Sequence, residues 1–331
     1  MDQQVEVGDA QQEQSELHVN APDEIWDKRF KATETGIYVH SEKGEGEWKK
    51  VCSPLYVAAE GRDANGKGWG LLVELPDADG TCHEIFLARE CLAGTGDDYR
   101  RVLLDHGLWL APGHAAKKNL EAYLATTQPK RRIRIVDRVG WYGETCFVMP
   151  DQVIGIAPNN ERVVLRKKPG IVHAYAVCGT LADWQEAVAR PAVGNSRLTF
   201  AISVALAAPL VSPMGYDGGI VHLRGASSTG KSTALIAASS VWGGGRPGYV
   251  RQWRATDNGL EGIAALHSDT LLALDELSQI DARAAGSATY MLANGAGKAR
   301  AARDGSLRQS ASFTCIGLSS GEVGLADKLM E

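Results

Sequence analysis

Residues 225–232 read Gly-Ala-Ser-Ser-Thr-Gly-Lys-Ser and fill the pattern G-x-x-x-x-G-K-[ST], in which a glycine-rich loop holds phosphate groups. Gly225 and Gly230 allow a concave backbone whose N–H groups point at a β-phosphate. Lys231 would bring a positive charge to the β- and γ-phosphates, and the Ser232 hydroxyl would ligate Mg²⁺. We therefore predict that this segment binds ATP with Mg²⁺, through Gly225, Ala226, Ser227, Ser228, Thr229, Gly230, Lys231, Ser232 and Thr233.

The sequence on either side of the loop has the character that such a loop requires. Residues 219–224 form a short apolar run typical of a strand, and residues 232–242 are rich in alanine and contain neither glycine nor proline, which favours a helix. In this order of strand, loop and helix, the phosphates lie at the N-terminus of the helix.

A second apolar strand follows at residues 270–276 and ends in two carboxylates, Asp275 and Glu276. Acidic residues at the end of a buried strand can hold Mg²⁺ and polarise the water that attacks the γ-phosphate. We assign the first task to Asp275, through water or Ser232, and the second to Glu276. Together with the loop, this pair predicts a P-loop ATPase.

The next strand ends at Ser319 and Ser320. ATPases of the oligomeric branch place a polar sensor at the end of the strand that follows the Asp-Glu strand. Either serine could therefore contact the γ-phosphate or its water, although asparagine or threonine is more usual at this position.

A basic segment lies between these two strands and contains Asp304-Gly305, a strong hairpin signal. In ring-shaped helicases a basic hairpin at this place in the chain grips the phosphates of a DNA strand. One arginine could instead complete the ATP site of a neighbouring subunit, and a solvated basic loop is the third interpretation. The cationic residues are Lys298, Arg300, Arg303 and Arg308.

The chain of 331 residues is long enough for two domains. Residues 1–21 are polar and acidic and are predicted to be disordered, and residues 22–180 read as a β-rich α+β domain with two helices near 97–107 and 114–125. From residue 181 the pattern alternates between strands and helices, which predicts a parallel sheet with helices on both faces.

Composition narrows the function classes. The net charge of −5 excludes a global basic field, so contact with nucleic acid must be local. The six cysteines are scattered without a C-x-x-C pair, and we expect them to be free and reduced. No stretch reads as a signal peptide or a membrane span, and we expect a cytoplasmic protein.

Several of these segments together resemble the family known as domain of unknown function 927, found in replication proteins of phage and plasmid type related to primase-helicases. The segments span residues 130–325 and are Gly140-Trp141, 147–151, the loop itself, 238–243, 253–261, 274–277, 290–300 and 318–322. The resemblance implies an AAA+-like or superfamily-3-helicase-like core, a DNA helicase or translocase of a mobile element that acts in DNA replication on single-stranded DNA, and assembly as a homo-oligomer, a hexameric ring in the complete protein.

Such a core should continue after the sensor strand into a fifth strand and a helical lid, and the sequence stops at Glu331, where they would begin. We therefore expect residues 181–331 to be a truncated core with weakened hydrolysis and ring assembly. The alternative function is an ATP-switched regulatory or scaffolding protein, for example in phage defence, which does not translocate on DNA. A phosphotransferase that uses the same loop is a third, less favoured function.

Overall fold

The computed structural model describes residues 27–40, 46–167, 172–244, 248–297, 300–301, 307–308 and 312–330. Its contacts divide the chain into two compact units between Arg134 and Ile135, inside strand β7 (Arg132–Val136). The expected boundary near 180 coincides instead with the change from strands to helices at α3 (Leu181–Trp184). The two positions differ because residues 139–165 share a core with Tyr175 and Leu266, later in the chain. Residues 1–21, predicted to be disordered, lie outside the described residues.

The first unit is rich in β-strands, as its sequence predicts, and most of its strand pairs are antiparallel. One sheet has the order β1-β2-β3, with β1 (Phe30–Thr33), β2 (Gly36–His40) and β3 (Trp48–Cys52). A second sheet contains β4 (Tyr56–Arg62), β5 (Gly70–Pro76) and β6 (Cys82–Ala88), which pair antiparallel, and β7, which pairs parallel with β4. Tight turns at Asn65-Gly66 and Asp79-Gly80 join β4 to β5 and β5 to β6, and both glycines have positive φ, 72° and 82°.

Two helices pack on these strands. They are α1 (Asp97–Asp105) and α2 (His114–Thr126), and the short 3₁₀ helix η1 (Arg89–Leu92) precedes them. Their predicted ranges are confirmed to within two residues. Leu103, Leu120, Tyr123 and Leu124 are completely buried in one core with strand residues such as Ile37. The first unit therefore has its own hydrophobic core.

The second unit begins with small antiparallel strands. These are β8 (Gly140–Trp141), β9 (Cys146–Val148) and β10 (Val153–Gly155), in the order β10-β9-β8, and they are followed by the 3₁₀ turn η2 (Pro158–Asn160) and β11 (Arg162–Leu165). The fold is thus α/β with both mixed and parallel sheets, since β11, β7, β4, β5 and β6 make a mixed sheet.

The first helical stretch of this unit continues through Pro191 and ends at Ala192. Helical structure runs from α3 through a π-type segment, η3 (Gln185–Ala189), into α4 (Arg190–Ala192). Proline cannot donate a backbone hydrogen bond to the preceding turn, and the wider π turn changes the bonding pattern where that donor is missing. The apolar helix that follows, α5 (Ser196–Ala207), closes with a 3₁₀ turn, η4 (Ala208–Leu210).

A four-stranded parallel sheet forms the centre of the second unit. Its order is β12-β17-β14-β13, with β12 (Gly219–Arg224), β13 (Arg251–Gln252), β14 (Leu271–Asp275) and β17 (Ile316–Gly321). Strand β17 follows the Asp-Glu strand β14 in the sequence, but in the sheet it lies between β14 and the loop strand β12. All four carboxyl ends lie at one edge of this sheet.

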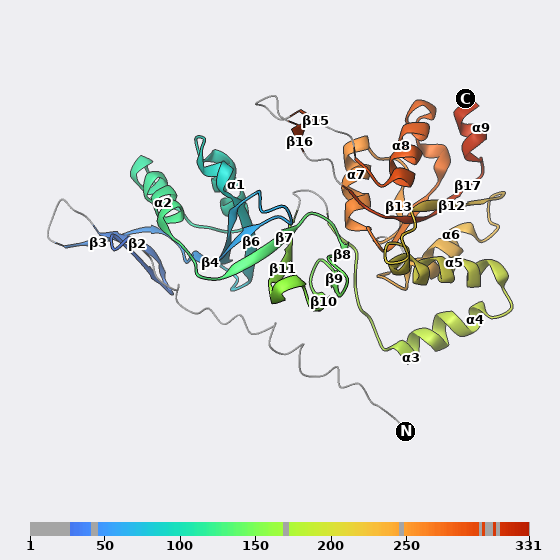
Figure 1. The fold of residues 1–331 in the computed structure, drawn as a ribbon, viewed down its shortest axis with the longest axis horizontal. Helices are drawn as coiled ribbons and strands as arrows, with labels where there is room; N and C mark the ends of the chain where they lie inside the picture. Colours follow the sequence, from blue (N-terminus) through green and yellow to red (C-terminus); the bar gives the residue numbers. More distant parts are fainter. Residues whose placement is uncertain are drawn as a thin grey trace, which may run out of the picture. The chain divides into compact units, whose positions relative to one another are not determined.

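Helices cover both faces of this sheet (Figure 1). Leu271 and Ala273 of β14 pack with α5 and α6 (Lys231–Ser239), whereas Leu272 and Leu274 pack with α7 (Asp257–Leu266) and α8 (Ala282–Asn294). This follows from the two-residue repeat of a strand, which sends alternate side chains to opposite faces. The 3₁₀ turn η5 (Leu277–Gln279) and helix α9 (Leu325–Met330) complete the unit.

Two expectations about composition can be compared with the structure. All six cysteines are free, at positions that range from buried to exposed. Within the part of the chain that the structure describes, no helix combines the length and the apolar character that crossing a bilayer requires.

Candidate active site

The glycine-rich loop joins β12 to α6 and bends sharply at two positions. Gly230, directly before α6, has φ 86°, and Ser228 has φ 60°. Left-handed residues of this kind let successive N–H groups converge on one point, which makes a concave binding site for an anion. The first N–H groups of α6 point toward the loop, as they do at the start of any helix. No side chain caps them, so they are available to an anion.

Lys231 folds back across this loop. Its ammonium group donates hydrogen bonds of 2.7 Å to the carbonyl oxygens of both Gly225 and Ala226. The Thr229 hydroxyl also donates to the carbonyl of Ala226, at 2.9 Å. The positive charge is therefore held within the loop by backbone dipoles.

The start of the loop is tied to the end of β17. The N–H of Gly225 donates to the carbonyl of Gly321 at 3.2 Å. Next to Gly321, the Ser320 hydroxyl donates to a carboxylate oxygen of Asp275, which is only 5% exposed. Two hydrogen bonds thus connect the loop to the end of β14, one between Gly225 and Gly321 and one between Ser320 and Asp275.

Glu276 follows Asp275 in an unusual conformation. Its φ of 62° and ψ of 75° place a residue other than glycine in the left-handed region, which costs roughly 1 kcal/mol or more. Its carboxylate accepts a hydrogen bond of 2.5 Å from the Ser278 hydroxyl, and its N–H lies 3.4 Å from Ser320 Oγ. The chain turns away from β14 at this residue, which is partly exposed at the sheet edge.

The structure separates the two candidate sensor serines. Ser320 lies with Asp275, whereas Ser319 is 1% exposed and accepts a hydrogen bond of 2.8 Å from the Trp253 indole. Ser319 Oγ also lies 3.0 Å from Nδ1 of His222, whose Nε2 is 2.9 Å from the Val323 carbonyl. Because Nε2 must donate to that carbonyl, Nδ1 accepts from the Ser319 hydroxyl.

Sequence reasoning gave His222 and Trp253 no part in this network. The partnership depends on β17 lying beside β12, since His222 and Ser319 are paired in the parallel register of those strands. Neighbouring residues in register on adjacent strands point to the same face. No local sequence signal could have identified the pair before the strand order was known.

The basic segment forms the base of a hairpin. The strands β15 (Arg300–Ala301) and β16 (Leu307–Arg308) pair antiparallel, with Arg300 opposite Arg308. Lys298, Arg303 and the predicted turn at Asp304-Gly305 lie outside the described residues.

The chain that leads into this hairpin is held by α7. Glu261 of α7 is 9% exposed and lies against Gly297, where a side chain would collide with the carboxylate. Phe313 N donates to the Gly295 carbonyl at 2.8 Å on the returning side. Glu261, for which the sequence suggested no role, thus packs against Gly297, close to the start of the hairpin.

Helix α9 also contacts this edge of the sheet. Arg224, the last residue of β12, forms an ion pair of 3.0 Å with Asp327, and Lys328 donates to the Ser278 carbonyl at 3.1 Å. Arg224 and Asp327 are both well exposed, so their ion pair contributes little to stability.

A second buried carboxylate, Asp269, lies just before β14, at the opposite end of that strand. Arg138 Nη1 donates to it at 2.8 Å, the Trp141 N–H donates at 3.0 Å, and the Ser212 hydroxyl donates to its other oxygen. Gly140 has φ 106°, and a side chain there would collide with this carboxylate. The Gly140-Trp141 segment therefore serves to enclose Asp269.

Comparison with known proteins shows a similar fold and the family of the chain. A solved structure described as "SCCmec type IV Cch - active helicase" is similar, with a TM-score of 0.65 and 20% identity over 91% of this chain. The present chain spans 55% of that protein. No curated protein matched. Residues 30–312 match the family described as "Domain of unknown function (DUF927)", and the chain therefore belongs to the DUF927 family.

Proposed function

We propose that this chain is the ATPase module of a DNA helicase or translocase, and that it binds and hydrolyses Mg²⁺-ATP at the carboxyl edge of the β12-β17-β14-β13 sheet. The observation that carries the proposal is the link across that edge. The N–H of Gly225 is bonded to Gly321, and the neighbouring Ser320 is bonded to Asp275. A loop shaped for an anion and a carboxylate suited to a cation thus share one edge.

The residues present fit both groups. Two left-handed residues and an uncapped helix start suit the phosphates, and Lys231 would exchange its contacts with loop carbonyls for phosphate oxygens. Mg²⁺ prefers hard oxygen ligands, which Ser232 and Asp275 supply. Bound Mg²⁺ would neutralise the charge that develops on the phosphates. The loop from Gly225 to Thr233 would enclose the nucleotide.

Glu276 is the residue we assign to the attacking water. A carboxylate beside the metal-binding Asp275 can orient and polarise water for attack on the γ-phosphate. Its left-handed backbone is consistent with strain retained for function, since residues of this kind cluster at active sites. Ser320, bonded to Asp275, is the better candidate for the sensor, and Ser319 would hold Trp253 and His222 in place.

The position of β17 supports a finer proposal. A strand inserted between the loop strand and the Asp-Glu strand is typical of the oligomeric branch of P-loop ATPases, which includes AAA+ proteins and superfamily-3 helicases. With the family membership and the helicase-like fold, it favours a replication motor of a mobile element that works as a homo-oligomer, in a hexameric ring in the complete protein.

DNA is the proposed partner of the β15–β16 hairpin. Its arginines would contact phosphates of a single strand, or one of them would reach the ATP site of a neighbouring subunit. The test is phosphate release from ATP with and without single-stranded DNA. Arg300→Glu combined with Arg308→Glu should remove stimulation by DNA, whereas Arg101→Glu, on the exposed side of α1, should retain it.

Each outcome of this experiment is informative. Stimulation by DNA that depends on the hairpin arginines supports a motor. Hydrolysis that is indifferent to DNA in the wild-type chain would overturn the helicase proposal and favour a nucleotide-switched regulator. Transfer of phosphate to an acceptor, in place of release, would indicate a phosphotransferase.

A further inference from the structure

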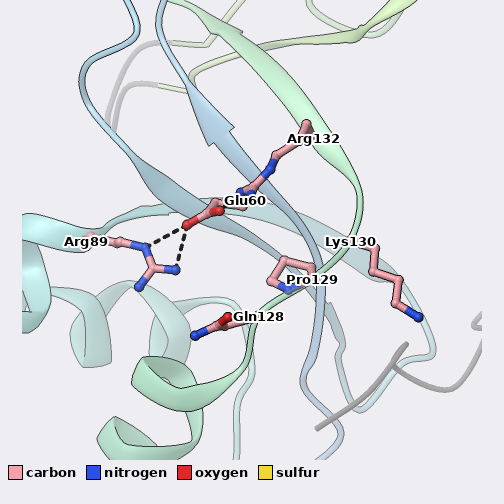
Figure 2. Close-up of a pocket in the computed structure, with 6 residues that line it drawn as sticks. All are labelled: Glu60, Arg89, Gln128, Pro129, Lys130 and Arg132. Carbon is pink, nitrogen blue, oxygen red and sulfur yellow. Dashed lines mark hydrogen bonds and ion pairs between the residues drawn. The ribbon is translucent and has the colours of Figure 1, made fainter. Parts of the chain in front are cut away.

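The first unit carries a cationic surface that surrounds an aromatic ring. It comprises Arg62, Trp69, Arg89, Lys130 and Arg132, which we call the Trp69 patch. Arg132, whose guanidinium group lies over the ring, also lines a pocket of about 420 Å³ (Figure 2). The residues around this pocket are Glu60, Arg89, Gln128, Pro129, Lys130 and Arg132. The Trp69 patch thus contains four cationic residues, in a chain whose net charge is −5.

The ring of Trp69 is fixed in place and partly exposed. Its indole N–H donates to the Gly66 carbonyl at 2.9 Å, and its own carbonyl accepts from the Arg89 N–H at 2.9 Å. The guanidinium groups of Arg62 and Arg132 lie over the ring, 5.6 Å and 5.4 Å from its centroid. The residue remains 39% exposed. Ring and guanidinium planes together form a surface on which flat groups can stack.

Glu60 orients the arginines of the pocket. One carboxylate oxygen accepts from Nε and Nη2 of Arg89, at 3.1 Å and 2.7 Å, and the other is paired with Arg132 (Figure 2). The carboxylate side chain is 14% exposed, whereas those of Arg89 and Arg132 are 35% and 49% exposed. The negative charge is thus covered by two guanidinium groups that face solvent, and the surface remains positive.

We propose that the Trp69 patch binds single-stranded DNA, with a base stacked on Trp69 and a phosphate in the adjoining pocket. Aromatic rings next to cations are the chemistry with which proteins bind single strands without reading their sequence. A duplex keeps its bases stacked inside, so it could use the cations but not the ring. An acidic peptide would also use the cations, and it would have no flat bases to place on the fixed indole.

The patch is made of residues of the first unit, whereas the proposed ATP site and the hairpin are made of residues of the second. The inference shares with the proposed function only the DNA partner. The experiment is fluorescence anisotropy of labelled oligothymidylate with the full chain, without nucleotide. Trp69→Leu should weaken binding roughly 5- to 100-fold, the range expected for one stacked base. Trp69→Phe should stay within about 3-fold of wild type because a ring is retained.

The arginines are tested by the salt dependence of binding. Arg62→Ala with Arg132→Ala should lower the slope of log Kd against log salt by about 0.7 for each phosphate that the variant no longer neutralises. Arg101→Ala is the matched control, since it removes an exposed arginine of the same unit outside the patch. Thermal unfolding of each variant shows whether the fold is intact.

The inference is overturned by undetectable binding to the wild-type chain, by unchanged affinity in Trp69→Leu, or by an equal loss on duplex DNA. It is also overturned if polyglutamate, and not DNA, loses affinity in the variants, because the patch would then be an acidic-peptide site. Phosphate release without DNA should be unchanged in every patch variant. If release stimulated by DNA persists while these variants bind normally, the patch proposal fails and the proposed function stands.

Discussion

Asp269 and Asp275 bracket the same strand, β14, and both are buried, but their surroundings differ in kind. Asp269 accepts hydrogen bonds from three other segments of the chain, through Arg138, Trp141 and Ser212. Asp275 accepts from Ser320, one residue from the strand end that also bonds the glycine-rich loop.

We interpret Asp269 as a structural carboxylate, and we propose that Asp275 is a functional one. A charge whose oxygens are used by the chain's own donors holds the fold together, and breaking such a pair leaves a buried charge uncompensated. A carboxylate at the edge where parallel strands end, beside an anion-binding loop, is placed to bind a ligand. Burial alone would not have distinguished the two.

The largest effect is expected at Asp269. Asp269→Ala should lower the free energy of unfolding by on the order of 3 kcal/mol, because the Arg138 guanidinium loses its carboxylate and Ser212 and the Trp141 N–H lose their acceptor. Urea denaturation measures this loss. Asp98→Ala, on the exposed surface of α1, is the control. A loss for Asp269→Ala no larger than that of the control would mean that the Asp269 end does not hold the fold.

A pH dependence is expected near the same end of β14. His267 is completely buried; Nδ1 lies 2.8 Å from the Ile263 carbonyl, and Nε2 has no hydrogen-bond partner among the described residues. Burial lowers the pKa of His267 from its ordinary value to about 4. Between about pH 6.5 and pH 4 the unfolded chain therefore binds the extra proton, so stability falls as the pH is lowered through this window.

The size of this loss follows from the shift in pKa and approaches about 3 kcal/mol by pH 4. It is measured by urea denaturation at a series of pH values. His267→Gln should flatten the profile in this window, and His173→Gln, a partly exposed histidine of the same unit, should not. An equally steep profile in His267→Gln would assign the acid sensitivity to other groups.

At the other end of β14 we expect a small effect on stability and a large one on ligand binding. Asp275→Asn keeps an acceptor for the Ser320 hydroxyl, so the free energy of unfolding should change by no more than about 1 kcal/mol. Removal of the charge should abolish the increase in ATP affinity that Mg²⁺ gives over EDTA. Calorimetry under both conditions tests this. Retained Mg²⁺ dependence would remove Asp275 from the metal site.

Glu276→Gly should have the smallest effect on the fold. Glycine relieves the left-handed strain at φ 62° but loses more entropy on folding, and a net stabilisation of about 0.5 kcal/mol or less is expected. Hydrolysis should be lost in the same variant. Thermal unfolding tests the expected stability, and phosphate release from ATP tests the expected loss of hydrolysis. A clear destabilisation would show that Glu276 is held by contacts that stabilise the fold.

Local sequence was sufficient for elements whose signals are local. The loop with its helix, the strand that ends at Asp275 and the helices of the first unit could all be placed because glycine positions and apolar periodicity act within a few residues. The sequence alone identified the glycine-rich loop, Asp275 and Glu276 as candidate site residues. The structure adds the hydrogen bonds that these residues make.

The remaining features depend on contacts between distant segments. Ser319 and Ser320 have different partners because β17 lies between β12 and β14. Asp269 is bonded by Arg138 and Trp141, which lie more than a hundred positions earlier in the chain. The Trp69 patch is of the same kind, because the position of Arg132 over the Trp69 ring depends on the pairing of β7 with β4.

The central claim is that the Asp275 end of the sheet is the site of ATP hydrolysis, with Glu276 acting on water. Its most direct test is single-turnover hydrolysis of saturating Mg²⁺-ATP by wild type and Glu276→Gln, with ATP affinity measured on the same samples and Glu186→Gln, an exposed carboxylate on η3, as control. We expect at least about 100-fold slower hydrolysis in Glu276→Gln and unchanged affinity. Hydrolysis at the wild-type rate in that variant would contradict it.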